Sequence, residues 1–246
     1  MTRSFQRAGL RRAGGEKRSE EDFTKHLVTN IDSTGVASEA YRTLRTNLLY
    51  ALVDEPLGVV VLTSAGPGEG KSTTCANLGV VLAQAGKRVL ILDCDFRKPR
   101  MHSIFGLRNF HGIMDVLVEE HSLPEVWQEP VEGLKVVCVG PRPPNPAEVL
   151  GGQRFSEFLA SVREEFDYVL VDTAPVGVVS DAVILATQGD GVLLVLDAQH
   201  TRKGAVRQAV RSLETVGANV LGTIMNNVKS SREGYYYDYS YAYEQR

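Results

Sequence analysis

The segment 65–72 carries the residue types that bind phosphate groups. It reads Ala-Gly-Pro-Gly-Glu-Gly-Lys-Ser, with an apolar run at 58–63 before it and a helical pattern at 71–85 after it. Glycines let the backbone turn its N–H groups around phosphate oxygens, and a helix start adds its positive dipole end. The lysine would contact the β- and γ-phosphates, and the serine hydroxyl would ligate Mg²⁺. The predicted nucleotide-binding residues here are Gly66, Pro67, Gly68, Glu69, Gly70, Lys71, Ser72 and Thr73.

Three aspartates follow or close apolar runs that are expected to be strands: Asp93, Asp95 and Asp172. Ligands collect at the carboxyl ends of parallel strands, and a carboxylate there is costly to bury without a metal or a partner. Asp172 is therefore predicted to hold Mg²⁺ through water. Asp93 and Asp95 would share one face of a continuing strand, where one faces the metal or accepts a proton and the other orients Arg97 or Lys98. A helix cap or a salt bridge to Arg97 is the structural alternative for Asp95.

A tyrosine cluster lies near the end of the chain. Six of its nine tyrosines fall within 235–243, among acidic residues and without aliphatic neighbours. Core tyrosines would follow a strand or helix period inside an apolar segment, and these do not. An accessible cluster of phosphoacceptors explains the composition and the position, while an interaction tail is the alternative. The predicted acceptors are Tyr235, Tyr236, Tyr237, Tyr239, Tyr241 and Tyr243.

These residues need a scaffold that gathers them at one edge. Apolar runs alternate with helical patterns, and strands that are apolar throughout are covered on both faces. The sequence therefore predicts an α/β fold, a doubly wound and mostly parallel sheet with helices on both faces, of the P-loop NTPase type. The expected strands are 58–63, 88–93, 134–139, 168–172, 191–197 and 220–225, and the expected helices are 38–53, 71–85, 112–119, 153–165, 180–187 and 203–216. The domain would span 37–227, between a flexible basic leader at 1–36 and a tyrosine-rich tail at 228–246.

The overall composition argues against several classes of protein. A formal charge of −3 gives no general attraction to nucleic acid. The sequence also contains no run of 18 apolar residues that could span a bilayer. Residues 1–18 hold six basic side chains against one acidic side chain. Such a segment is either a solvated leader or a basic arm for a membrane surface. The cysteines have no metal-binding spacing and are expected to be buried in a reducing cytosol: Cys75, Cys94 and Cys138.

Three motifs together resemble those of the bacterial tyrosine kinases, the cytoplasmic autokinases of capsular and exopolysaccharide export. The motifs are the phosphate loop, the D-x-D-x-R sequence that begins at Asp93, and the apolar run that ends at Asp172. The stretches 97–105, 143–148 and 180–182 agree as well, so the resemblance covers 37–246. Many members carry proline where this chain has Ala174, but Asp172 and Pro175 remain.

The resemblance implies ATP- and Mg²⁺-dependent transfer of phosphate to tyrosine, mainly in the chain's own tail. It implies catalytic roles for Lys71, Asp93, Asp95 and Asp172, and metal-ligand roles for Ser72, Asp93 and Asp172. It also implies a homo-oligomeric ring formed through Glu39, Arg42 and Arg45. The expected partners are a transmembrane activator of polysaccharide export and a tyrosine phosphatase, with the chain held at the cytoplasmic face of the cell membrane.

Two other functions fit the phosphate loop. The first is a Walker ATPase that positions plasmids or septa, although many such proteins carry a second lysine where this chain has Gly66. The second is a nucleotide-gated scaffold whose tail binds partners. The last expected strand also delivers Asn226 and Asn227 to the edge that holds the phosphate loop, so one of them is predicted to contact adenine. A turn asparagine is the structural alternative.

Overall fold

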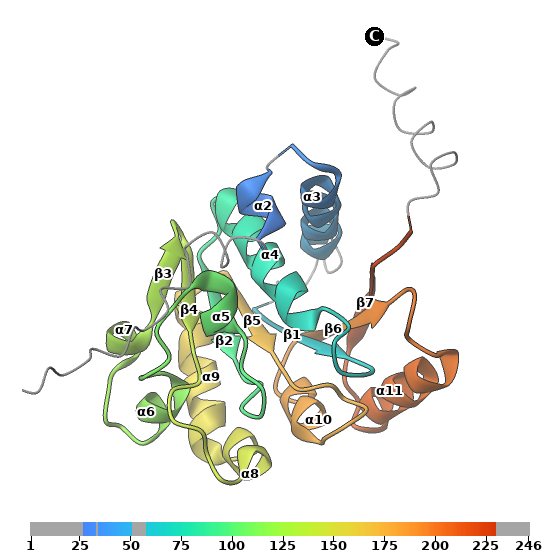
Figure 1. Cartoon of the computed structure of the whole chain (residues 1–246). Coiled ribbons are helices and arrows are strands. Elements are labelled where there is room, and N and C mark those ends of the chain that lie inside the picture. The colour runs from blue at the N-terminus through green and yellow to red at the C-terminus, as the bar shows by residue number, and fades with distance from the viewer. Residues whose placement is uncertain (1–26, 33, 51–57, 230–246) are drawn as a thin grey trace, which may run out of the picture.

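The computed structural model describes residues 27–32, 34–50 and 58–229. Seven strands form one sheet in the order β3-β4-β2-β5-β1-β6-β7 (Figure 1). All neighbouring strands are parallel except β3 and β4, which are antiparallel. The strands are β1 (Val59–Ser64), β2 (Val89–Asp93), β3 (Gln128–Val131), β4 (Leu134–Val137), β5 (Tyr168–Asp172), β6 (Gly191–Asp197) and β7 (Val220–Asn226).

Helices cover both faces of this sheet (Figure 1). One apolar core joins the sheet to α3 (Val36–Tyr50), α4 (Lys71–Gln84) and α5 (Met101–Phe105), and to Leu27, which directly precedes α2 (Val28–Ile31). The other core joins it to α6 (Ile113–Leu117), α7 (Leu123–Val126), α8 (Pro146–Leu150), α9 (Gln153–Glu165), α10 (Asp181–Ala186) and α11 (Lys203–Thr215). The central strands β1, β2 and β6 are buried at every residue, as expected for strands covered on both faces.

The predicted doubly wound α/β fold is confirmed, and most strand bounds agree with the sequence pattern within one or two residues. The prediction missed β3 and the short helices α2, α5, α7 and α8. These elements have five residues or fewer, so neither a strand period nor a helix period is long enough to be seen. The three cysteines are free and buried, as predicted.

The start of the domain lies earlier than the predicted boundary at residue 37. Leu27 is buried, and the Thr29 hydroxyl donates to Asn77 of α4 at 2.9 Å, so residues that were expected in the flexible leader pack on the domain. Ser38 lies within the first turn of α3, because this helix begins at Val36 and not at residue 38 as expected. Its hydroxyl instead donates back to the carbonyl oxygen of Val28 at 3.1 Å, which ties α3 to α2.

Candidate active site

The phosphate loop connects β1 to α4 and depends on two glycines with left-handed backbone. Gly68 has φ of 80° and Gly70 has φ of 90°, a region in which side chains are strained. A Cβ atom on Gly70 would also lie 2.4 Å from the Asn226 amide nitrogen. The loop leaves Pro67 and Gly68 exposed at its rim, and α4 begins directly at Lys71. The loop therefore presents a helix N-terminus and a lysine at one point, as phosphate binding requires.

Lys71 is buried among carboxylates. Its Nζ donates to Asp95 Oδ2 at 2.9 Å and to Asp172 Oδ1 at 3.5 Å, and it also donates to the Ser72 hydroxyl at 3.1 Å. Burial lowers the pKa of Lys71, but the carboxylates of Asp172 and Asp95 outweigh burial, so the pKa is raised. The ammonium group is therefore charged and fixed in the site, ready to neutralise phosphate oxygens.

Asp93 closes β2 and is completely buried. Its Oδ2 accepts hydrogen bonds from the backbone N–H groups of Arg100 and Met101 at 3.0 and 2.9 Å, while its Oδ1 has no hydrogen-bond partner. Burial and the neighbouring Asp172 carboxylate raise the pKa of Asp93 to about 7. An unpaired oxygen of this kind is costly unless a ligand, metal or transferred proton uses it.

Asp172 closes β5, directly beside Asp93 in the register of the two strands. It is fully buried, and its Oδ2 also has no hydrogen-bond partner. Burial raises its pKa, while the charge of Lys71 and a hydrogen bond from Ser72 oppose that effect. Two unpaired carboxylate oxygens and a serine hydroxyl form a donor set that suits Mg²⁺, which prefers hard oxygen ligands together with phosphate and water.

The structure brings Asp95 into the site by a different route from the one predicted. The strand β2 ends at Asp93, so Asp93 and Asp95 do not share a face of a continuing strand. Asp95 instead begins a turn in which its Oδ1 accepts from the backbone N–H of Lys98 at 2.9 Å, and its Oδ2 binds Lys71.

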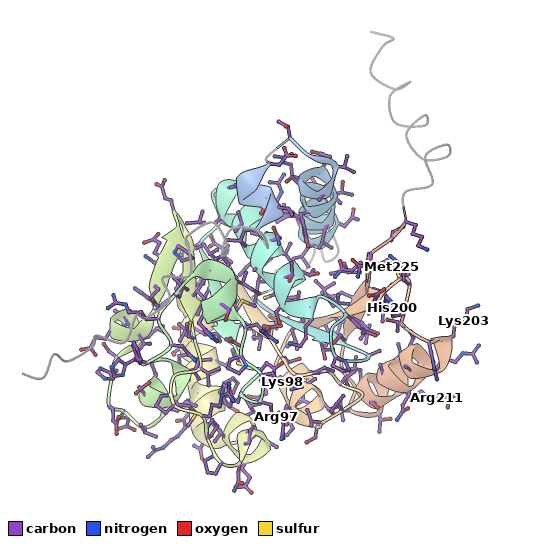
Figure 2. The ribbon with its side chains drawn as sticks, in the orientation of Figure 1. Arg97, Lys98, His200, Lys203, Arg211 and Met225 are labelled. Atoms are coloured by element: carbon purple, nitrogen blue, oxygen red, sulfur yellow. The ribbon has the colours of Figure 1, made fainter. Side chains whose placement is uncertain are left out.

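Arg97 pairs with Asp181 and does not pair with Asp95. Two hydrogen bonds of 2.8 and 3.0 Å join the guanidinium group to the buried carboxylate at the start of α10. Arg97 and Lys98 both lie on the loop after β2 (Figure 2). The family resemblance includes 180–182 without implying a role for Asp181, and the structure shows that Asp181 anchors this loop.

The outer side of the phosphate loop rests on β7 and on the turn after β6. The Asn226 amide nitrogen donates to the Glu69 carbonyl oxygen at 3.0 Å and to the Thr74 hydroxyl at 3.1 Å. The Glu69 carboxylate is buried and accepts a hydrogen bond from Thr201. The amide nitrogen of Asn226 therefore supports the loop, and the predicted adenine contact of Asn226 or Asn227 remains a prediction.

The residues predicted for self-association lie on α3. Glu39 and Arg42 form an ion pair of 2.8 Å. Arg45 turns inward instead, because its guanidinium group donates to the Val81 carbonyl oxygen of α4 at 3.2 Å. The three residues therefore lie on one helix, where Glu39 is exposed, Arg42 is half-buried and Arg45 bonds to α4 of its own chain. The predicted tyrosine acceptors and the basic segment at 1–18 lie outside the described residues.

Comparisons with known proteins agree with this geometry. A family model described as an AAA domain matches residues 58–226. The chain is 42% identical over 216 residues to the tyrosine-protein kinase YwqD of Bacillus subtilis, covering 86% of this chain and 91% of that protein. Among solved structures, the kinase domain of the Escherichia coli tyrosine kinase ETK superposes with a TM-score of 0.80 at 31% identity, covering 85% of this chain and 83% of that chain.

The septum site-determining protein MinD of Pyrococcus horikoshii, solved with Mg-ADP, has a TM-score of 0.57 at 23% identity and covers 68% of this chain and 69% of that chain. That likeness shows only that the P-loop fold, a nucleotide-binding fold, is shared. The identity and the coverage of the kinases are higher, and the chain belongs to the family of bacterial tyrosine-protein kinases.

Proposed function

We propose that the chain is an ATP- and Mg²⁺-dependent autokinase that phosphorylates the tyrosines of 235–243. The observation that carries the proposal is the buried site at the ends of β2 and β5. Lys71 is fixed there by Asp95 and Asp172, and Asp93 and Asp172 each keep one buried oxygen without a partner. A positioned cation and open oxygen ligands are what phosphoryl transfer needs from a protein.

Lys71 and Ser72 would hold the nucleotide. In phosphoryl transfer, negative charge spreads over the oxygens of the moving group, so catalysis depends mainly on positioning and electrostatic stabilisation. Lys71 would supply one fixed positive charge, and Asp95 would hold its ammonium group in place. A magnesium ion held by Ser72 and Asp172, with Asp93 beside them, would neutralise phosphate oxygens when it is bound.

Asp93 would receive the proton of the attacking tyrosine at its unpaired Oδ1. An ordinary aspartate with a pKa near 4 is a weak base for a phenol with a pKa near 10. Burial and the charge of Asp172 raise the pKa of Asp93 to about 7. That shift brings the pKa of Asp93 closer to the pKa of the tyrosine hydroxyl and makes Asp93 a better general base.

The rim of the site favours an acidic substrate. Lys98, Arg100 and Arg142 are exposed, and the charges of both arginines lower the pKa of His102 after the larger effect of burial. These cations come from the loops after β2 and β4, at the edge that also holds Asp93. The tyrosine-rich segment carries acidic residues among its tyrosines, namely Glu233, Asp238 and Glu244, and is therefore the matching substrate.

Self-association would bring a tail to a neighbouring site. Glu39 and Arg42 present a charged face on α3, with Arg45 in the next turn. A ring formed through this face would offer the site of the next subunit at a high effective concentration. The double substitution Arg42→Ala with Arg45→Ala should give a monomer in light scattering, with circular dichroism as the check on folding; an unchanged mass would reject the interface.

The cellular setting belongs to the same proposal. By its resemblance to autokinases of capsular and exopolysaccharide export, the chain would regulate that export at the cytoplasmic face of the membrane, with a transmembrane activator and a tyrosine phosphatase as partners. No helix in the described part of the chain is long and apolar enough to cross a membrane. In this proposal, recruitment would depend on the activator, aided by basic residues of 1–18. If the same fraction of the protein were recovered with the membrane in cells with and without the exporter, recruitment by the activator would be contradicted.

Incubation with γ-labelled ATP and Mg²⁺ tests the proposed function directly. Label on tyrosine of the protein is the expected result, and deletion of 232–246 should remove most of it. Free phosphate without labelled protein would instead favour the positioning ATPase, and neither product would favour the scaffold. The deleted chain should still bind ATP, because the described contacts of the phosphate loop lie before residue 230.

A further inference from the structure

Two histidines and a buried aspartate lie together away from the phosphate loop. His111 Nδ1 is 3.3 Å from Asp115 Oδ1, and the rings of His111 and His121 meet edge to face with their centroids 4.5 Å apart. One potential ligand atom from each residue lies within 4.8 Å of the other two. Asp115 is buried, His111 is exposed and His121 is half-buried, so the group opens to solvent on one side.

The backbone around this group is held by many hydrogen bonds. Asp115 Oδ2 accepts from the Gly112 N–H at 2.7 Å, which leaves Oδ1 to face the imidazole. After α6, Glu119 adopts a φ of 64°, and the N–H groups of Glu120 and His121 both bond to the Asp115 carbonyl oxygen, at 3.0 and 3.4 Å. This tight turn returns His121 to the start of the helix.

The same segment is anchored to the end of β4. The N–H groups of Ile113 and Met114 bond to the carbonyl oxygens of Cys138 and Val139 at 2.9 and 3.2 Å. A Cβ on Gly112 would lie 2.0 Å from the Cys138 carbonyl oxygen, so the two backbones are in direct contact. The position of Asp115 and of the two imidazoles is therefore set by the fold.

The chemistry of the three side chains is that of a transition-metal ligand set. Neutral imidazole nitrogens together with one carboxylate oxygen suit Zn²⁺ and similar divalent ions, with water in the fourth position. Ligand atoms around tetrahedral zinc are about 3.4 Å apart for metal–ligand bonds near 2.1 Å. The exposed His111 ring can close the remaining gap by rotation about its own side-chain bonds.

We propose that His111, Asp115 and His121 bind one zinc-class cation, distinct from the magnesium that the phosphate loop would use. The ion would join the start of α6 to the turn that follows it. Because that segment is bonded to the end of β4, metal binding would stabilise this part of the sheet edge. The ordinary alternative is a helix cap beside two imidazoles in edge-to-face contact, with no affinity for metal.

Cobalt titration of the metal-stripped full chain, without nucleotide, tests the proposal. Tetrahedral Co²⁺ with nitrogen ligands gives intense visible absorption, whereas an oxygen-ligated octahedral ion at the phosphate loop does not. We expect one equivalent of Co²⁺ to produce this spectrum, Zn²⁺ to remove it, and millimolar Mg²⁺ to leave it unchanged.

Variants then assign the ligands. His111→Ala and His121→Ala should each weaken binding by at least about tenfold and should lose the rise in melting temperature that Zn²⁺ gives the wild type. His200→Ala is the matched control, because His200 also faces an aspartate, with its Nδ1 3.1 Å from Asp197 Oδ2, but is not part of the three-residue group. It should bind as the wild type does. Absence of the spectrum in the wild type, or equal affinity in all three variants, would overturn the proposal; melting temperatures without metal verify that each variant folds.

Discussion

Two aspartates that close strands at the same edge of the sheet have opposite electrostatics. Asp93 at the end of β2 has one oxygen without a partner, and its pKa is raised to about 7 by burial and by Asp172. Asp197 at the end of β6 accepts from the Asn227 amide, from the backbone of Gln199 and from His200. These hydrogen bonds lower its pKa to about 2.

The difference shows what distinguishes a carboxylate that is available for chemistry from one that holds a turn together. Both residues end an apolar run, so strand position alone does not distinguish them. Asp93 is left with an open oxygen beside a second carboxylate, which makes its ionisation depend on what enters the site. Asp197 has its oxygens satisfied by the turn after β6 and therefore holds that turn together. The ends of β2 and β5 form the edge at which we propose the chemistry, named the reactive edge below, and the turn after β6 supports it.

Lys71→Met should have the largest effect. It removes the fixed positive charge from the reactive edge while leaving the hydrogen bonds of Asp197 intact. Loss of one preorganised group of this kind lowers rates on the order of 10²–10³. Tyrosine labelling by γ-labelled ATP should fall at least that far, and full labelling in the variant would show that the site is assigned wrongly.

Asp93→Asn should separate transfer from binding. The amide oxygen can still accept from the backbone of Arg100 and Met101, but the side chain can no longer take a proton. We expect the rate of tyrosine transfer to fall far more than the affinity for ATP, measured by single-turnover kinetics and calorimetry. Equal losses in both would make Asp93 a metal ligand or a structural residue instead of a base.

The same substitution should stabilise the nucleotide-free protein at high pH. In the folded state Asp93 holds its proton up to about pH 7, whereas in the unfolded chain it ionises near pH 4. Stability is therefore lost as the pH rises through this window. Asp93→Asn should raise the free energy of unfolding by roughly 1–3 kcal/mol at about pH 8, with the gain vanishing toward pH 4. Denaturant unfolding at both pH values measures this, and a destabilised variant at pH 8 would contradict the raised pKa.

Asp197→Asn should change stability with the opposite sign. A carboxylate whose folded pKa is about 2 stabilises the fold above its unfolded pKa, and this contribution is lost as the pH falls through 2. The variant should melt below the wild type at neutral pH and approach it in acid. If its melting temperature matched the wild type at neutral pH, Asp197 would not hold the turn as described.

The sequence predicted the residues of the reactive edge better than the contacts that hold this edge in place. The phosphate loop and Asp172 were visible because a lysine and a carboxylate interrupt long apolar patterns. The pairing of Arg97 with Asp181 joins residues 84 positions apart, and no local pattern signals such a contact. Asp197 also ends an apolar run, but its role depends on Asn227, which only the parallel pairing of β6 with β7 brings close. The His111 group depends in the same way on a turn that the chain's periodicity does not reveal.

The most direct measurement mixes two chains. A full-length Lys71→Met chain is expected to transfer little phosphate but keeps its tyrosines, and a chain with Lys71 that ends at Ser231 keeps the site but lacks them. With γ-labelled ATP, we predict label on the full-length chain, at a rate that rises with the concentration of the active one. An unlabelled mixture, together with wild-type labelling at a rate independent of concentration, would show that each chain phosphorylates only itself and would contradict transfer between subunits.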